Sequence, residues 1–105
     1  MIKIEFVLQN GQIGGFSVKG HSGTAERGAD IVCAGVSSLA QTALLGLMRQ
    51  INAAVDYKVT GGDMSVFLQD APTELTEAVL QTMRLGLIEI AKQYPQAVKI
   101  KETGR

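Results

Sequence analysis

Apolar and polar residues alternate over the first ten positions of the chain. A period of two predicts a strand with one buried face, and its apolar positions are Ile2, Ile4, Phe6 and Leu8. Asn10-Gly11 follows, a dipeptide that accepts the positive φ of a tight hairpin turn. Residues 12–19 are expected to form the return strand, in which Gly14-Gly15 indicate a bulge or a bend.

Two later segments have helical spacing. Residues 31–54 contain no proline, and their apolar positions cover most of a helical circumference, which predicts a largely buried helix. A second helix is expected to open at Pro72-Thr73-Glu74 and to stop at Tyr94-Pro95, because acids favour a first turn and proline ends a helix.

Three further strands complete the predicted order. Residues 55–60 and 64–69 are expected to pair through a hairpin loop at 61–63, and residues 97–101 form a short last strand before a frayed tail. The order is strand, strand, helix, strand, strand, helix, strand. It predicts one α+β domain over residues 1–105, a two-layer α/β fold with a largely antiparallel sheet and both helices on one face.

Composition narrows the classes of function. At 46% hydrophobic, the 105 residues can bury a core without metals or cross-links. Ten basic and ten acidic residues give a net charge of zero, which argues against a large electrostatic footprint for RNA or DNA but leaves a small local patch open. The single cysteine excludes an intramolecular disulfide and fits a reducing cytoplasm. We expect no signal peptide and no association with a membrane.

The candidate chemistry lies where the periodicity breaks, in a predicted loop at residues 20–30. Asp30 is a good N-cap for the first helix, which would put Cys33 in its first turn. The partial positive charge at a helix N-terminus favours a thiolate, and orphan N–H groups there can hold an oxyanion. His21, the only histidine, precedes Cys33 by twelve residues. A thiol and an imidazole form the minimal activated nucleophile.

Simpler interpretations exist for the same residues. A cysteine in a helix usually packs in the core, and a histidine in a loop is usually a surface or capping residue. Ser22 and Ser37 are not expected to be nucleophiles, because neither lies in a G-x-S-x-G motif. One cysteine and one histidine are too few for a closed metal site, and we expect neither a metal nor a cofactor. Taken alone, these residues leave both the catalytic and the structural interpretation open.

A longer motif favours the catalytic interpretation. Residues 20–35 read GHSGTAERGADIVCAG, which resembles the signature of the ribosomal-processing cysteine protease family, Prp. The resemblance extends over nearly the whole chain. It implies that His21 and Cys33 are catalytic and that Asp30 caps the helix and steadies the loop. Gly20 and Ser37 take supporting positions.

The resemblance also implies a substrate. The family removes a short N-terminal extension from the twenty-seventh protein of the large ribosomal subunit, cutting after two aromatic residues. Its members are homodimers. The first predicted helix is apolar around more of its circumference than one sheet face can cover, so we expect Leu44, Leu47, Met48 or Ile51 to contact the second subunit.

Two other functions compete with proteolysis. One is a non-catalytic ribosome-assembly factor that binds the same ribosomal protein, and the presence of both His21 and Cys33 favours the enzyme over it. The other is a small RNA-binding adaptor, which the zero net charge and the five aromatic residues disfavour. We therefore expect no direct contact with nucleic acid.

Overall fold

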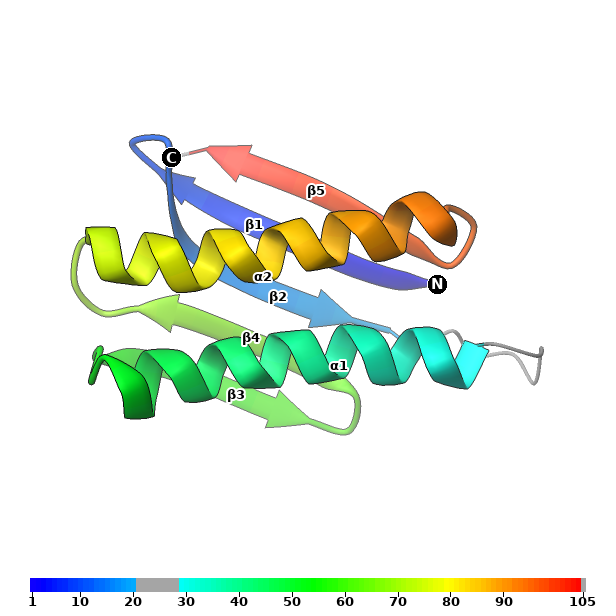
Figure 1. Cartoon of the computed structure of the whole chain (residues 1–105), viewed down its shortest axis with the longest axis horizontal. Coiled ribbons are helices and arrows are strands. Elements are labelled where there is room, and N and C mark those ends of the chain that lie inside the picture. Colours follow the sequence, from blue (N-terminus) through cyan, green and yellow to red (C-terminus); the bar gives the residue numbers. More distant parts are fainter. Residues whose placement is uncertain (21–28, 105) are drawn as a thin grey trace.

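Two helices cover one face of a five-stranded sheet in the computed structural model (Figure 1). The structure describes residues 1–20 and 29–104. Residues 29 and 30, the first two of the first helix, are described by their backbone only. The elements in chain order are β1 (Ile2–Gln9), β2 (Gln12–Lys19), α1 (Ala29–Leu45), a π-helical turn η1 (Gly46–Gln50), β3 (Val55–Thr60), β4 (Asp63–Leu68), α2 (Glu74–Gln93) and β5 (Val98–Gly104).

The sheet order is β3-β4-β2-β1-β5. Three of its pairs are antiparallel, and β5 runs parallel to β1, so the sheet is mixed. The predicted α+β fold with both helices on one face is confirmed (Figure 1). The prediction of a frayed tail is wrong, because β5 continues to Gly104, which pairs with Leu8. Hydrogen bonding along β1 orders this end of the chain.

The predicted bulge lies in β2. Val7 pairs with Gly15 and Leu8 pairs with Ile13, so Gly14 is the extra residue. A Cβ at Gly15 would lie 2.8 Å from the carbonyl oxygen of Val66 and would overlap the ring of Phe67. Glycine is needed at this position because the neighbouring strand and its aromatic ring come too close for a side chain.

The first helix begins and ends earlier than its pattern predicts. It starts at Ala29 rather than at residue 31, and its π-helical turn ends at Gln50 rather than at 54. Asn52 follows with a φ of 53°, a left-handed conformation that no helix continues through. One stripe of this helix packs against α2 and the sheet in the hydrophobic core. The core residues that the helix and the π-helical turn contribute are Val32, Val36, Ala40, Ala43, Leu44 and Leu47.

Residues Ile31–Gln50 are long and apolar enough to cross a membrane, judged by length and composition alone. The core helix of a folded domain passes the same test. Here the buried stripe of this segment packs against the sheet and α2, but only 33% of the segment is buried. Ile31 and Leu45 are exposed at 71% and 41%, so the prediction of a largely buried helix is not met within one chain.

Helix α2 is fixed at its start and along its length. Thr73 and Thr76 form a reciprocal cap, with Thr76 N donating to Thr73 Oγ1 at 3.1 Å and Thr73 N donating to Thr76 Oγ1 at 2.8 Å.

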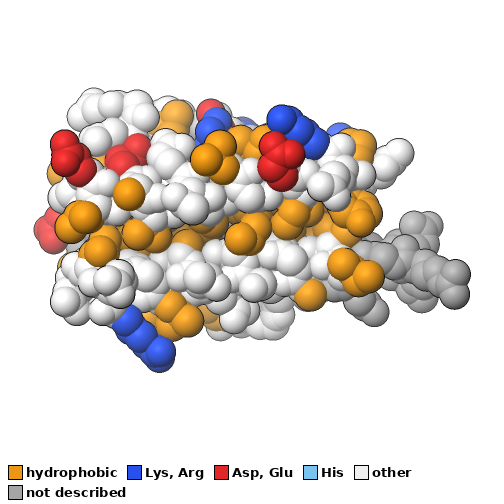
Figure 2. All heavy atoms as spheres, in the orientation of Figure 1, with side chains coloured by type: hydrophobic (Ala, Val, Ile, Leu, Met, Phe, Trp, Pro, Cys, Tyr) orange, Lys and Arg blue, Asp and Glu red, His pale blue; other side chains and the backbone are white. Residues whose placement is uncertain are grey.

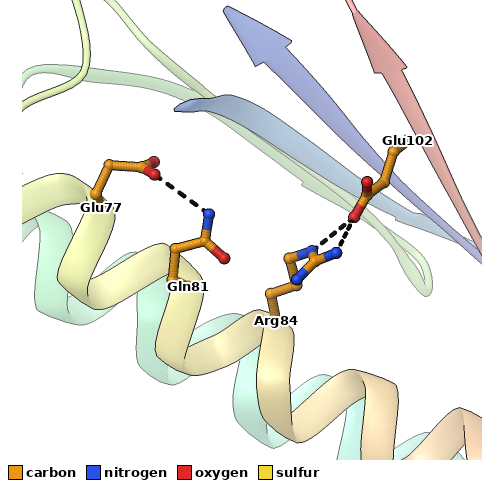
Figure 3. A network of polar contacts seen from close by, with 4 residues as sticks. All are labelled: Glu77, Gln81, Arg84 and Glu102. Atoms are coloured by element: carbon orange, nitrogen blue, oxygen red, sulfur yellow. Dashed lines mark hydrogen bonds and ion pairs between the residues drawn. The ribbon is translucent and has the colours of Figure 1, made fainter. Parts of the chain in front are cut away.

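Polar contacts connect α2 to the sheet (Figure 3). Arg84 forms an ion pair with Glu102 on β5. Glu77 Oε1 accepts from the backbone N of Ile13 at 2.7 Å, directly beside the bulge.

Candidate active site

Helix α1 begins at the end of the sheet where β1 starts and β2 ends (Figure 1). Cys33 is the fifth residue of this helix, and it is half-buried and packed against the core. Its neighbours on the buried stripe are Val32 and Val36, at 3% and 1% exposure. Cys33 therefore lies at the margin of the stripe, packed against the core and partly accessible.

The helix start corrects the expected position of Asp30. Because α1 begins at Ala29, Asp30 is the second residue of the helix and not its N-cap. Cys33 then follows the first turn instead of lying within it. The helix dipole acts mainly over the first turn, so it contributes less at Cys33 than the sequence pattern suggested.

Gly20 determines where the chain leaves β2. Its φ is +86°, and a Cβ there would lie 2.5 Å from the carbonyl oxygen of Met1. Its backbone N donates to Asp63 Oδ1 at 3.0 Å. Both the left-handed backbone and the close approach require glycine. Gly20 thus directs the chain toward the segment that contains His21.

Ser37 lies one helical turn beyond Cys33 and is exposed. Residues four apart share one face of a helix, so Ser37 and Cys33 face the same side of α1. His21, the side chain of Asp30 and most of the predicted loop at 20–30 lie outside the described residues. Of the five predicted site residues, the structure thus describes Gly20, Cys33 and Ser37 in full and Asp30 by its backbone only.

The contributions of Asp63 and Met1 were not predicted. Asp63 on β4 accepts a hydrogen bond from Gly20 across 43 positions of sequence, and the carbonyl of Met1, just before β1, leaves no room for a side chain at Gly20. Nothing in the local pattern of either residue points to Gly20, because their contact depends on which strands become neighbours.

The described part of the chain forms no metal centre. Within residues 1–20 and 29–104, no three His, Cys, Asp or Glu side chains lie close enough together to hold a metal ion. A half-buried thiol near the start of a helix suits covalent catalysis by sulfur.

A family model described as Cysteine protease Prp matches residues 1–99. The chain belongs to the cysteine protease Prp family. A curated Prp relative, the ribosomal processing cysteine protease of Staphylococcus aureus strain NCTC 8325, is 27% identical over 104 residues. That alignment covers 95% of this chain and 97% of the relative. The predicted family is confirmed, and with it the activity class of a cysteine protease.

Solved structures agree in fold with this Prp chain. SMU.848 from Streptococcus mutans superposes with a TM-score of 0.88 at 27% identity, covering 100% of this chain and 96% of that one. The S. aureus Prp in complex with a substrate peptide superposes with a TM-score of 0.90 at 23% identity. The same protease with a covalently linked product peptide gives 0.89 at 24% identity. Each S. aureus comparison covers 98% of this chain and 100% of the other.

Proposed function

We propose that the chain is an endopeptidase that removes the N-terminal extension of a large-subunit ribosomal protein, the twenty-seventh, with a Cys33–His21 dyad. One observation carries the assignment of residues: a cysteine protease needs a thiol and a base, and this chain contains one cysteine and one histidine. The curated relatives are named ribosomal processing proteases, and the S. aureus enzyme has been solved with substrate and covalently linked product peptides. These names support the proposed substrate class.

The reaction proceeds through an acyl-enzyme. His21 accepts the proton of the Cys33 thiol, and the thiolate forms a bond to the carbonyl carbon of the scissile peptide. Orphan N–H groups at the start of α1 stabilise the oxyanion. The C–N bond then breaks, and the leaving amine takes the proton from the imidazolium. A water molecule, deprotonated by His21, cleaves the thioester and restores the thiol.

The position of Cys33 makes the base more important. Since Cys33 lies beyond the first turn of α1, the helix dipole alone activates it weakly. His21 therefore provides most of the activation of the Cys33 thiol. Asp30 is proposed to steady the segment that carries His21. Ser37, exposed on the face of Cys33, is proposed to contact the bound peptide.

The nucleophile is tested with Cys33→Ser. The substrate is the ribosomal protein with its natural extension, and cleavage is followed by mass spectrometry. We expect at least about 10³-fold slower cleavage with an unchanged unfolding midpoint, because the hydroxyl is a far weaker nucleophile. Ser38→Ala, an exposed change on the same helix, is the control and should retain full activity. Cleavage by Cys33→Ser at the wild-type rate would show that the assignment is wrong.

The base is tested with His21→Ala. Loss of general-base catalysis predicts cleavage slower by about 10²–10⁴-fold, and alkylation of Cys33 by iodoacetamide should slow as well. If the wild-type protein binds the ribosomal protein but never cuts it, the alternative of a non-catalytic assembly factor is correct.

We also propose that the enzyme is a homodimer. Leu44 and Leu47, expected at the interface, are instead buried in the core of one chain at 6% and 0% exposure. The unfilled apolar surface lies between the helices (Figure 2), as a groove of about 400 Å³ lined in part by Leu39, Ala78 and Val79. This groove supports a helix-to-helix dimer.

The dimer is tested by light scattering at micromolar concentration. Ala78→Lys places a charge in the groove at an exposed position and should give a monomer, because burying an unpaired charge is costly. Gln93→Lys, exposed at the end of the same helix, should remain dimeric. A wild-type monomer would contradict the proposal.

A further inference from the structure

Most lysines of this chain lie on one side of the molecule. Five of the six lie on strands, and the strand register places all five on the face that Glu5 and Ser17 share. Because side chains alternate along a strand, this face is opposite the buried Ile4 and Phe16 and therefore opposite the helices. All five are exposed: Lys3, Lys19, Lys58, Lys99 and Lys101. We call this surface the open face. The net charge of the whole chain is nevertheless zero, because acidic residues balance these lysines, and among the described residues Glu74 and Glu77 lie on α2.

Three of these lysines form a row across the sheet. Lys3 on β1 pairs with Lys19 on β2 and with Lys99 on β5. Like charges directly opposite each other destabilise a sheet, and within the described residues no ion pair relieves this row. An anion outside the chain would offset the repulsion.

The carboxylates of the open face already have donors. Glu5 accepts from Thr103 Oγ1 at 2.7 Å, and Asp56 accepts from Gln69 Nε2 at 3.0 Å. Asp63 accepts from the backbone of Gly20. These hydrogen bonds hold the negative groups in the surface, whereas the longer lysine side chains can reach beyond it.

A hollow of about 490 Å³ lies on the same face. Its lining carries Lys19 and Lys58 together with the carboxylates of Glu5 and Asp63, which already accept hydrogen bonds from within the chain. Ser17 and Ser65, which pair across β2 and β4, provide hydroxyl groups. Phe67, whose ring overlies Gly15, adds an aromatic surface beside the hydroxyls. Ammonium groups, hydroxyls and an aromatic ring are the groups that hold the phosphates and bases of a single strand.

We propose that the open face binds single-stranded RNA through its phosphate backbone. Lysine is depleted at protein–protein interfaces, which favours RNA over an acidic protein. Apart from Val7 and Phe67, the alternation places few apolar side chains on this face, too few for insertion into a lipid surface. No arginine lies on these strands, so the contacts are made by point charges and recognise no particular sequence. The proposal does not depend on the protease activity.

The test measures fluorescence anisotropy of a labelled RNA of about 20 nucleotides in about 50 mM salt. Lys3→Gln combined with Lys99→Gln should weaken binding about ten-fold and make the salt dependence of log K shallower by about 1.4, at about 0.7 for each phosphate that is no longer neutralised. The control combines Arg49→Gln with Lys92→Gln, which removes the same charge from exposed positions on the helical layer. The control should bind almost as well as the wild type.

Other outcomes overturn the proposal. Equal weakening in both double variants would mean attraction by net charge alone. Absence of RNA binding, or binding only to phosphatidylserine vesicles or polyglutamate, would assign the face to another partner. Should the Lys3 and Lys99 variant fail to fold, Lys58→Gln combined with Lys101→Gln removes two other lysines of the open face, and the same weakening is expected.

Discussion

At the scale of single residues, two glycines hold the sheet and the site together. Gly15 lets the ring of Phe67 lie over the bulged strand. Gly20 combines a left-handed backbone with a close approach to Met1, immediately before the segment that contains His21. Both positions are fixed by neighbours from other strands, so their role depends on tertiary contacts.

Gly20→Ala is expected to lower both stability and peptidase activity. The added Cβ would clash with the carbonyl of Met1, and the alanine backbone would have to keep a strained positive φ. We expect a loss of about 2 kcal/mol or more in the free energy of unfolding. Gly61→Ala is the matched control, because Gly61 also has a positive φ but no atom within 4 Å of its Cβ. Urea denaturation should show a cost of about 1 kcal/mol there. Equal costs for the two variants would show that contact with Met1 is unimportant.

At the scale of elements, α2 is held to the sheet by polar groups as well as by its apolar stripe. Glu77 lies in the first turn, where the helix dipole favours an acid, and its carboxylate also accepts from the N–H of Ile13. Gln81 donates to the other oxygen of this carboxylate at 3.2 Å. The side chain thus connects the bulge of β2 to the start of α2.

Glu77→Ala should destabilise the protein by about 1–3 kcal/mol, because it leaves the N–H of the fully buried Ile13 without an acceptor. Glu77→Gln preserves an acceptor oxygen and should recover part of the loss. Glu89→Ala is the control, since its ion pair with Lys92 is exposed and should change stability by less than about 0.5 kcal/mol. If calorimetry found equal effects for Glu77→Ala and Glu89→Ala, the contact with Ile13 would have no stabilising role.

At the scale of the whole molecule, the two ends of the chain meet. The parallel pair of β1 and β5 joins residues 2–8 to residues 98–104, and Val98 of β5 is in the core at 2% exposure. The same arrangement puts Lys99 beside Lys3. The last strand therefore completes the core on one face of the sheet and the lysine row on the other.

Val98→Ala should cost about 2 kcal/mol in the free energy of unfolding, since it removes two buried methyl groups and leaves a cavity. Val59→Ala makes the same chemical change on β3 at the opposite edge, where the residue is 56% exposed. That variant should change stability by less than about 0.5 kcal/mol. Denaturation curves that shift equally would show that β5 contributes little to the core.

The sequence alone determined the local elements and the candidate nucleophile. Periodicity of two and of 3.6 depends only on neighbours along the chain, so the first four strands, the hairpin turn at Asn10-Gly11 and the start of α2 were predicted within one or two residues. The last strand ends at Gly104, three residues beyond its predicted end. The motif around Cys33 was likewise continuous in sequence. The start of α1 was missed because residues 29 and 30 follow a segment without periodicity.

Only the tertiary structure decided which elements became neighbours. The parallel pairing of β5, the close approach of Gly20 to Met1 and the burial of Leu44 and Leu47 within one chain all join distant positions. The open face has the same origin. Net charge is a sum over residues and contains no information on their arrangement, whereas strand alternation and register place five lysines on one side of the sheet.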